Sequence, residues 1–154
     1  MKLSHLDAEG RVRMVDVGDK PVSDRRAVAT GAVRMSRKAY ELVAGDGVPK
    51  GDVLAVAEVA GVMGAKRTGE LIPLCHPLGL NHVQVEARLD PELPGVQVTA
   101  AARVTGRTGV EMEALTAVTV ACLTIYDMVK AVDKEMVIQE VKLVSKAKRP
   151  AHGS

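Results

Sequence analysis

The chain has 154 residues, a formal net charge of +2 and 47% apolar residues, a balance typical of one globular domain without a broad basic surface for DNA. Only 1% of the residues are aromatic, which argues against single-stranded nucleic-acid binding because bases usually stack on aromatic side chains. The two cysteines make no disulfide framework, and no signal peptide or membrane-spanning run is evident, so we expect a cytoplasmic protein with neither nucleic-acid nor membrane partners.

The first part of the chain predicts an arm, a strand and a short helix. Residues 1–24 are polar and irregular, and we expect them to form a flexible N-terminal arm. Residues 26–35 predict a strand, because apolar residues occupy alternate positions. A short helix follows, with Ser36 as its N-cap and Gly45 at its end.

Residues 51–68 predict a longer helix with three small residues on one side. Ala57, Gly61 and Gly64 follow one another at spacings of four and three residues, so they share a face. Small side chains allow another backbone to come close, although glycine inside a helix costs about 1 kcal/mol relative to alanine. We expect this face to pack against a partner chain.

A proline-bracketed loop comes next, and three kinds of site are considered for it. Pro73 and Pro77 stand too close together for a helix or a central strand to pass between them. A zinc site would need Cys75 and His76 with further ligands, but adjacent Cys and His are poorly spaced for chelation. A nucleophilic thiol needs a base, and none is evident. A rigid substrate-binding loop fits the prolines best, and a structural role for His76 remains an alternative.

The following segment predicts a hairpin and a long helix. Residues 82–89 and 96–104 alternate between apolar and polar positions, which is typical of two paired antiparallel strands. The long helix is expected to begin at Thr108 as N-cap, with Glu111 completing a capping box. It should continue to about Asp133, and its apolar middle predicts burial on nearly all sides.

A last strand over 136–146 and a loose tail over 147–154 complete the chain. Without the extra short helix, the order of elements is the split βαβ pattern. We therefore expect a ferredoxin-like α+β fold, with an antiparallel sheet, helices on one face and a single domain over 25–146.

Two features of the chain indicate chemistry. Asp127 and Lys130 lie one helical turn apart beyond an apolar stretch; an ordinary surface ion pair is the simple reading, and a cleft-facing acid–base pair is the alternative. Lys50 lies between Pro49 and Gly51, without an evident structural duty. Phosphate binding needs several cations together, and six basic residues could supply them: Arg25, Arg26, Lys50, Lys66, Lys130 and Lys146.

Three segments resemble the cyclic pyranopterin monophosphate synthase family of molybdenum cofactor biosynthesis. They are the "MVDV" at Met14, "KGDVLAVAEVAGVMGAKRTGELIPLCHPL" over 50–78 and "TGRTGVEMEALTAVTVACLTIYDMVKAVDK" over 105–134. The resemblance implies a ferredoxin-like fold, a homohexamer built as a trimer of dimers, and an active site at the dimer interface. It also implies a lyase that converts 3′,8-cyclo-7,8-dihydroguanosine 5′-triphosphate to cyclic pyranopterin monophosphate and pyrophosphate. We expect no cofactor and no metal-ligating residues in the chain.

The resemblance also carries over site residues. The catalytic candidates are Asp127, Lys50 and Lys130. The substrate-binding candidates are Leu74, Cys75, His76, Met112, Glu113, Arg25, Lys66 and Lys146. Only the tail departs from the family's pattern, because it lacks the usual glycine-rich loop after the last strand.

Two other functions remain open from the sequence. One is a small RNA-binding ferredoxin-like domain, against which the lack of aromatic residues counts. The other is an oligomeric regulator that binds a nucleotide without catalysis. For the enzyme, we expect a site shared between chains, with Lys50 and Lys130 contributed by opposite chains.

Overall fold

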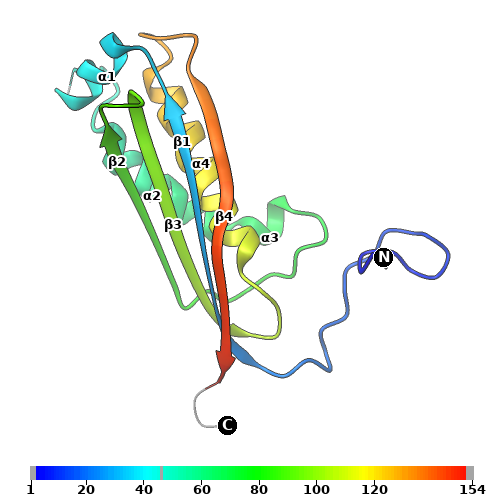
Figure 1. Ribbon diagram of the computed structural model, residues 1–154. Helices are drawn as coiled ribbons and strands as arrows, with labels where there is room; N and C mark the ends of the chain where they lie inside the picture. Colours follow the sequence, from blue (N-terminus) through cyan, green and yellow to red (C-terminus); the bar gives the residue numbers. More distant parts are fainter. Residues whose placement is uncertain (1–2, 46, 152–154) are drawn as a thin grey trace.

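The computed structural model describes residues 3–45 and 47–151 and has a four-stranded antiparallel sheet at its centre (Figure 1). The order of the strands across the sheet is β2-β3-β1-β4. This is the order of the split βαβ pattern, in which each helical crossover skips one strand. The strands are β1 (Ser23–Arg34), β2 (His82–Asp90), β3 (Gly95–Gly106) and β4 (Val137–Pro150).

Two helices, α2 (Val53–Lys66) and α4 (Glu111–Val129), cover one face of this sheet (Figure 1). The expected ferredoxin-like α+β fold is thereby confirmed. The short helix α1 (Arg37–Ala44) is the expected extra helix, and a single turn, α3 (Thr68–Leu71), adds another that the sequence did not predict.

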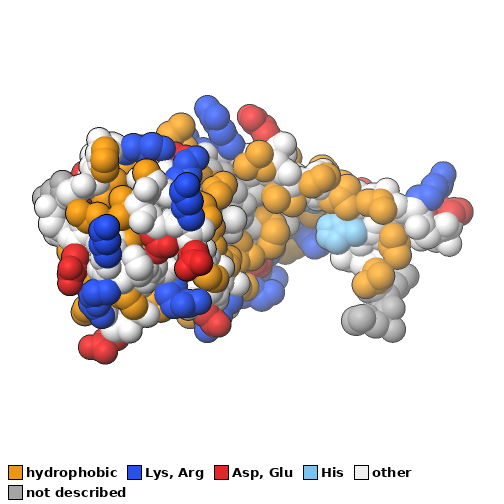
Figure 2. Space-filling model, turned by 90° about the horizontal axis from the view of Figure 1, so that it is seen from above, with side chains coloured by type: hydrophobic (Ala, Val, Ile, Leu, Met, Phe, Trp, Pro, Cys, Tyr) orange, Lys and Arg blue, Asp and Glu red, His pale blue; other side chains and the backbone are white. Residues whose placement is uncertain are grey.

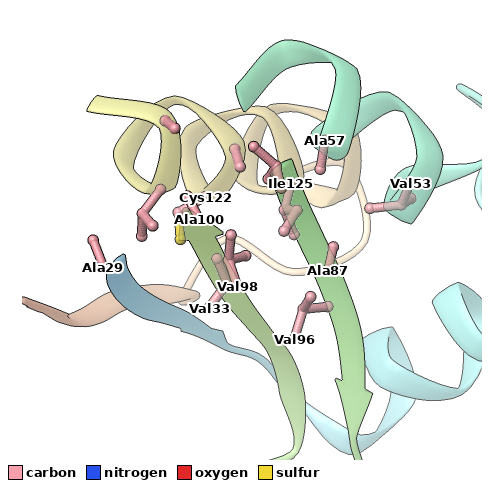
Figure 3. Packing of buried hydrophobic residues seen from close by; sticks show 14 of the residues in the cluster. Ala29, Val33, Val53, Ala57, Ala87, Val96, Val98, Ala100, Cys122 and Ile125 are labelled. Atoms are coloured by element: carbon pink, nitrogen blue, oxygen red, sulfur yellow. The ribbon is translucent and has the colours of Figure 1, made fainter. Parts of the chain in front are cut away.

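Small aliphatic side chains form the core between the helices and the sheet (Figure 3). Val33, Val98 and Ala100 project from the strands, and Cys122 and Ile125 project from α4 towards them. Each of these side chains is fully buried. The core is built from alanine and valine instead of large aromatic side chains, so the helices can lie close to the sheet.

The start of α4 differs from the sequence expectation. Val110 is the N-cap, no side chain caps the helix, and Glu111 is its first residue rather than the third position of a capping box. The expected cap at Thr108 was therefore wrong. The N-cap predicted at Ser36 for α1 is confirmed, because the Ser36 hydroxyl accepts a hydrogen bond from the Ala39 N–H.

The C-terminal strand is longer than expected. β4 continues to Pro150 and pairs with β1 along its whole length, where Asp24 lies opposite Arg149. The expectation of a loose tail was therefore wrong for residues 147–150, while residues 152–154 lie outside the described part of the chain. The long antiparallel partner strand explains the extension, because it offers hydrogen bonds up to its first residue, Ser23.

Helix α4 is exposed on one side, contrary to the expectation of burial all round. Leu123 is 58% exposed and Met112 is 38% exposed. By length and composition α4 would also suit a membrane span, but half of it is buried inside the fold. A core helix of a globular domain has these same properties.

The small residues of α2 pack against α4 of the same chain. Ala57 is fully buried, and a Cβ at Gly61 would lie 3.0 Å from the Ala117 carbonyl oxygen. A Cβ at Gly64 would meet the Val120 side chain at 2.8 Å. The expectation that this face receives a partner chain was wrong, because α4 already occupies it.

This close approach predicts that Gly61→Val destabilises the fold. The added atoms would also meet Val85, whose Cγ1 lies 2.9 Å from an ideal Cβ, and overpacking of this kind costs about 1–3 kcal/mol. Thermal unfolding should show a midpoint lower by several degrees. Ala55→Val, on the exposed side of the same helix, introduces the same β-branched residue and should change the midpoint little. Equal midpoints for the two variants would contradict the packing argument.

Candidate functional site

Three charged side chains meet at the C-terminal end of α4. Lys130 Nζ lies 3.1 Å from Asp127 Oδ1, and Lys50 Nζ lies 3.1 Å from Asp127 Oδ2. Lys50 also donates a hydrogen bond of 3.1 Å to the Asp127 carbonyl, so it has a structural duty after all, as a cation at a helix C-terminus. We call Lys50, Asp127 and Lys130 the Asp127 group. Figure 2, which looks onto this end of the fold, shows basic and acidic side chains close together on its surface.

Both lysines of this group belong to one chain and contact the same carboxylate. The expectation that opposite chains contribute Lys50 and Lys130 was therefore wrong. The hydrogen bonds from Lys130 and then from Lys50 lower the pKa of Asp127 below its usual value. A carboxylate with a lowered pKa is a weak base at neutral pH, so Asp127 is better suited to holding the two ammonium groups in place.

The hydrogen bond from Lys130 contributes most to the lowered pKa of Asp127, so removing Lys130 should have a measurable effect. In Lys130→Ala, the pKa of Asp127 should rise towards its usual value, because the carboxylate loses one of its two cationic partners. A carboxyl ¹³C titration followed by NMR measures this directly. Lys134→Ala, a charge loss nearby in the chain, is the matched control and should leave the Asp127 titration in place. An unchanged Asp127 pKa in Lys130→Ala would contradict the geometry.

The opposite end of α4 lies against the proline-bracketed loop. Cys75 Sγ lies 3.8 Å from Glu113 Oε2. Glu113 is only 2% exposed, and its Oε1 has no hydrogen-bond partner among the described residues. Burial raises the pKa of this carboxyl. Beside Cys75 is a hollow of about 420 Å³, which Cys75 lines together with Leu74, His76 and Met112.

A second hollow of about 310 Å³ adjoins the first and is basic. Arg25 and Lys146 line it, and Lys146 Nζ lies 3.9 Å from Glu111 Oε1. Glu111 and Gly109 line both hollows, so the two belong to one end of the fold. We call this the Cys75 group, and its sequence-identified members are Arg25, Leu74, Cys75, His76, Met112, Glu113 and Lys146. Lys66, the last residue of α2, is exposed and forms no ion pair among the described residues.

The length of α4 keeps the two groups apart. Glu113 and Asp127 are fourteen residues apart in this helix, which corresponds to about 21 Å at 1.5 Å per residue. At about 100° per residue, fourteen residues make nearly four full turns, so the two side chains leave roughly the same side of the helix. One chain alone therefore presents two separate sets of candidate residues.

A family model described as the MoaC family matches residues 14–149. The chain belongs to the MoaC family. It is 59% identical to the cyclic pyranopterin monophosphate synthase of Chloroflexus aggregans, over 94% of this chain and 88% of that protein. It is 60% identical to the synthase of Cereibacter sphaeroides strain KD131 and 57% identical to that of Dinoroseobacter shibae, in both cases over 94% of this chain and 91% of the relative.

The structure adds residues of the N-terminal arm to the candidate site of this MoaC-family chain. His5, Val15, Val17 and Lys20 line the hollow beside Cys75, and the Lys20 carbonyl accepts a hydrogen bond of 3.2 Å from Arg107 Nε. Polarity alone marked this segment as an arm, so sequence reasoning missed these residues. The only available signal was the "MVDV" motif that begins at Met14.

The surroundings of Cys75 favour a role in lining the hollow. Partial burial, followed by the nearby Glu113 carboxylate, raises the pKa of the Cys75 thiol to about 11. The thiolate is the nucleophile, so this thiol is a poor nucleophile at neutral pH. Within residues 3–45 and 47–151, no group of three or more His, Cys, Asp or Glu side chains could hold a metal ion.

We therefore expect Cys75→Ser to retain most of the turnover, and the purified protein to carry no stoichiometric zinc. Iodoacetamide at pH 7.5 should alkylate Cys75 far more slowly than it alkylates free N-acetylcysteine, because little of the thiol is ionised. Cys122 is fully buried and serves as the internal control that should not react. Rapid alkylation of Cys75 with loss of turnover, or tightly bound zinc, would reverse this assignment.

Proposed function

We propose that this chain is a cyclic pyranopterin monophosphate synthase, a lyase of molybdenum cofactor biosynthesis that acts in the cytoplasm. Its substrate would be 3′,8-cyclo-7,8-dihydroguanosine 5′-triphosphate, and its products cyclic pyranopterin monophosphate and pyrophosphate. Relatives with that name at 57–60% identity over nearly the whole chain support the activity. The observation that carries the mechanism is the separation of the two candidate groups at opposite ends of α4.

A second copy of the chain would complete the site. In a two-fold dimer, a contact between residue i of one chain and residue j of its partner occurs twice. If the Asp127 group of one chain meets the Cys75 group of its partner, the dimer therefore has two equivalent sites. We propose that such dimers assemble further into a homohexamer, a trimer of dimers.

Within such a site, the Cys75 group, together with Lys66, would hold the substrate. Arg25, Lys66 and Lys146 would bind the triphosphate and neutralise the charge that develops as pyrophosphate leaves. Glu113 would accept hydrogen bonds from the N–H edge of the guanine-derived ring. The stiff loop that carries Cys75 would fix the position of that ring.

The Asp127 group would transfer protons during ring opening and pterin closure. Lys50 and Lys130 are the proton donors and acceptors in this scheme, because a lysine can act as an acid or a base when its environment adjusts its pKa. Asp127 would orient both ammonium groups, which its two short contacts already do in the single chain.

Pyrophosphate release from the cyclised GTP intermediate, coupled to mass detection of the pterin product, tests this function. We expect stoichiometric amounts of both products. Tight binding of the intermediate without pyrophosphate release would instead identify a nucleotide-binding regulator. A salt-dependent shift of RNA mobility, with neither binding nor release of the intermediate, would identify an RNA-binding domain.

A further inference from the structure

The face of the sheet that the helices leave open carries a third hollow, of about 610 Å³. Every one of the four strands contributes a basic side chain to its lining: His82 from β2, Arg103 from β3, Arg26 from β1 and Arg149 from β4. All four residues are exposed. Arg26 and Arg103 point away from the core, because their neighbours Ala27 and Ala102 are buried in it.

The register of the strands places these basic side chains next to one another. Arg26 lies directly opposite Arg103 on the neighbouring strand, and Arg103 lies directly opposite His82. Like charges in directly opposite positions destabilise a sheet. The arrangement therefore has an electrostatic cost that the pairing itself does not offset.

No acidic side chain of the described residues forms an ion pair with the arginines of this hollow. Arg26, Arg103 and Arg149 take part in none of the ion pairs found within residues 3–45 and 47–151. Asp24 is the one carboxylate that lines the hollow, and it accepts a hydrogen bond of 2.6 Å from the Thr105 hydroxyl. A mobile anion or a bound anionic ligand has to balance the remaining charge.

We propose that this hollow, which adjoins the basic hollow of the Cys75 group and contains none of the Asp127 group, binds small phosphate-bearing anions of its own. Guanidinium groups bind phosphate with two parallel hydrogen bonds, and several of them around one concave surface suit a polyphosphate. Gln84 adds an amide that can donate to the ligand, and Ala101 leaves the floor of the hollow free of a long side chain. Arg25 and Arg26 line both this hollow and the basic hollow of the Cys75 group, so neither is substituted in the test.

A second copy of the chain is a poorer occupant of the same surface. In a two-fold contact the same patch meets itself, so the three arginines would face the three arginines of the partner. Opposed charges of one sign disfavour such an interface. A small anion, in contrast, meets complementary charge on every side.

Inorganic pyrophosphate is the probe, and the histidine ring signals in the NMR spectrum of the full-length, assembled protein are the readout. The chain has only four histidines, and substitution of each one assigns its signals. His82 reports the proposed hollow, while His76 reports the loop beside Cys75. The measurement needs no turnover, so it stays informative whether or not the proposed enzymatic function holds.

We expect pyrophosphate to shift the His82 signals saturably, with an affinity that decreases as salt is added. Arg103→Gln should weaken this response about tenfold or more, because it removes a pair of charge-assisted hydrogen bonds, and should leave the His76 response unchanged. Arg88→Gln is the matched control: it lies on the same strand as His82, opposite Gln97 and outside the hollow. If Arg103→Gln does not fold, Arg149→Gln provides the same test from β4.

Three results would overturn the proposal. In the first, pyrophosphate leaves the His82 signals unmoved. In the second, Arg103→Gln and Arg88→Gln bind it as the wild type does. In the third, Arg103→Gln lowers the mass of the assembly while Arg88→Gln keeps it, which would make this face a contact between subunits.

Discussion

Lys50→Ala should reduce pyrophosphate release by about 10²–10⁴-fold, the range typical of losing a general acid or base. Lys50 Nζ contacts both a side-chain oxygen and the carbonyl oxygen of Asp127, so the substitution removes one of the two ammonium groups at this end of α4. The side chain of Lys50 is 49% exposed, and a cation that caps a helix in such a position contributes only about 0.3–1 kcal/mol. The thermal midpoint should therefore fall only slightly.

Lys38→Ala is the matched control for this substitution. Lys38 is exposed on α1 and forms no ion pair among the described residues. We expect this variant to keep both its turnover and its thermal midpoint. A large loss of stability in Lys50→Ala, with turnover per folded molecule retained, would show that Lys50 serves the fold rather than the chemistry.

Mixing two inactive variants should restore activity only when their substitutions fall in different groups of the site. Lys50→Ala lies in the Asp127 group and His76→Ala in the Cys75 group, at opposite ends of α4. In a mixed dimer, one site combines the two substituted groups and the other combines the two intact groups. With equal amounts and random mixing, half of the dimers are mixed, so about a quarter of all sites should recover.

The control is a pair of variants from within one group. Lys50→Ala and Lys130→Ala both alter the Asp127 group, so every site in their mixed dimers contains one substitution, and no activity should return. Native mass spectrometry checks that mixed assemblies have formed in both experiments. Recovery in the control, or none with His76→Ala, would mean that the two groups do not meet across a dimer interface as proposed.

Local patterns in the sequence predicted most elements of the fold. Ser36 has the side chain of an N-cap, and the alternation over 82–89 and 96–104 predicted a hairpin that the structure confirms. Each of these signals lies within a few neighbouring residues. The start of α4 was misread, because Thr108 and Glu111 match a capping box by type and spacing while the backbone turns into the helix only at Val110.

The contacts that define the candidate site could not be predicted in the same way. The family resemblance supplied residue identities, but no local pattern states that Lys50 reaches Asp127, 77 positions further along the chain. Likewise, the small residues around Gly61 predicted a close neighbour but did not identify that neighbour as α4 of the same chain. Such pairings depend on how the helices cross the sheet, and only the folded backbone determines them.

The length of α4 limits which insertions and deletions the candidate site can tolerate. A single residue inserted between Glu113 and Asp127 would turn the second side chain by about 100° relative to the first and move it about 1.5 Å along the axis. Substitutions on the exposed side of α4, for example at Leu123, leave that geometry intact. Natural variation along this segment should therefore replace the exposed residues readily but almost never add or remove a residue.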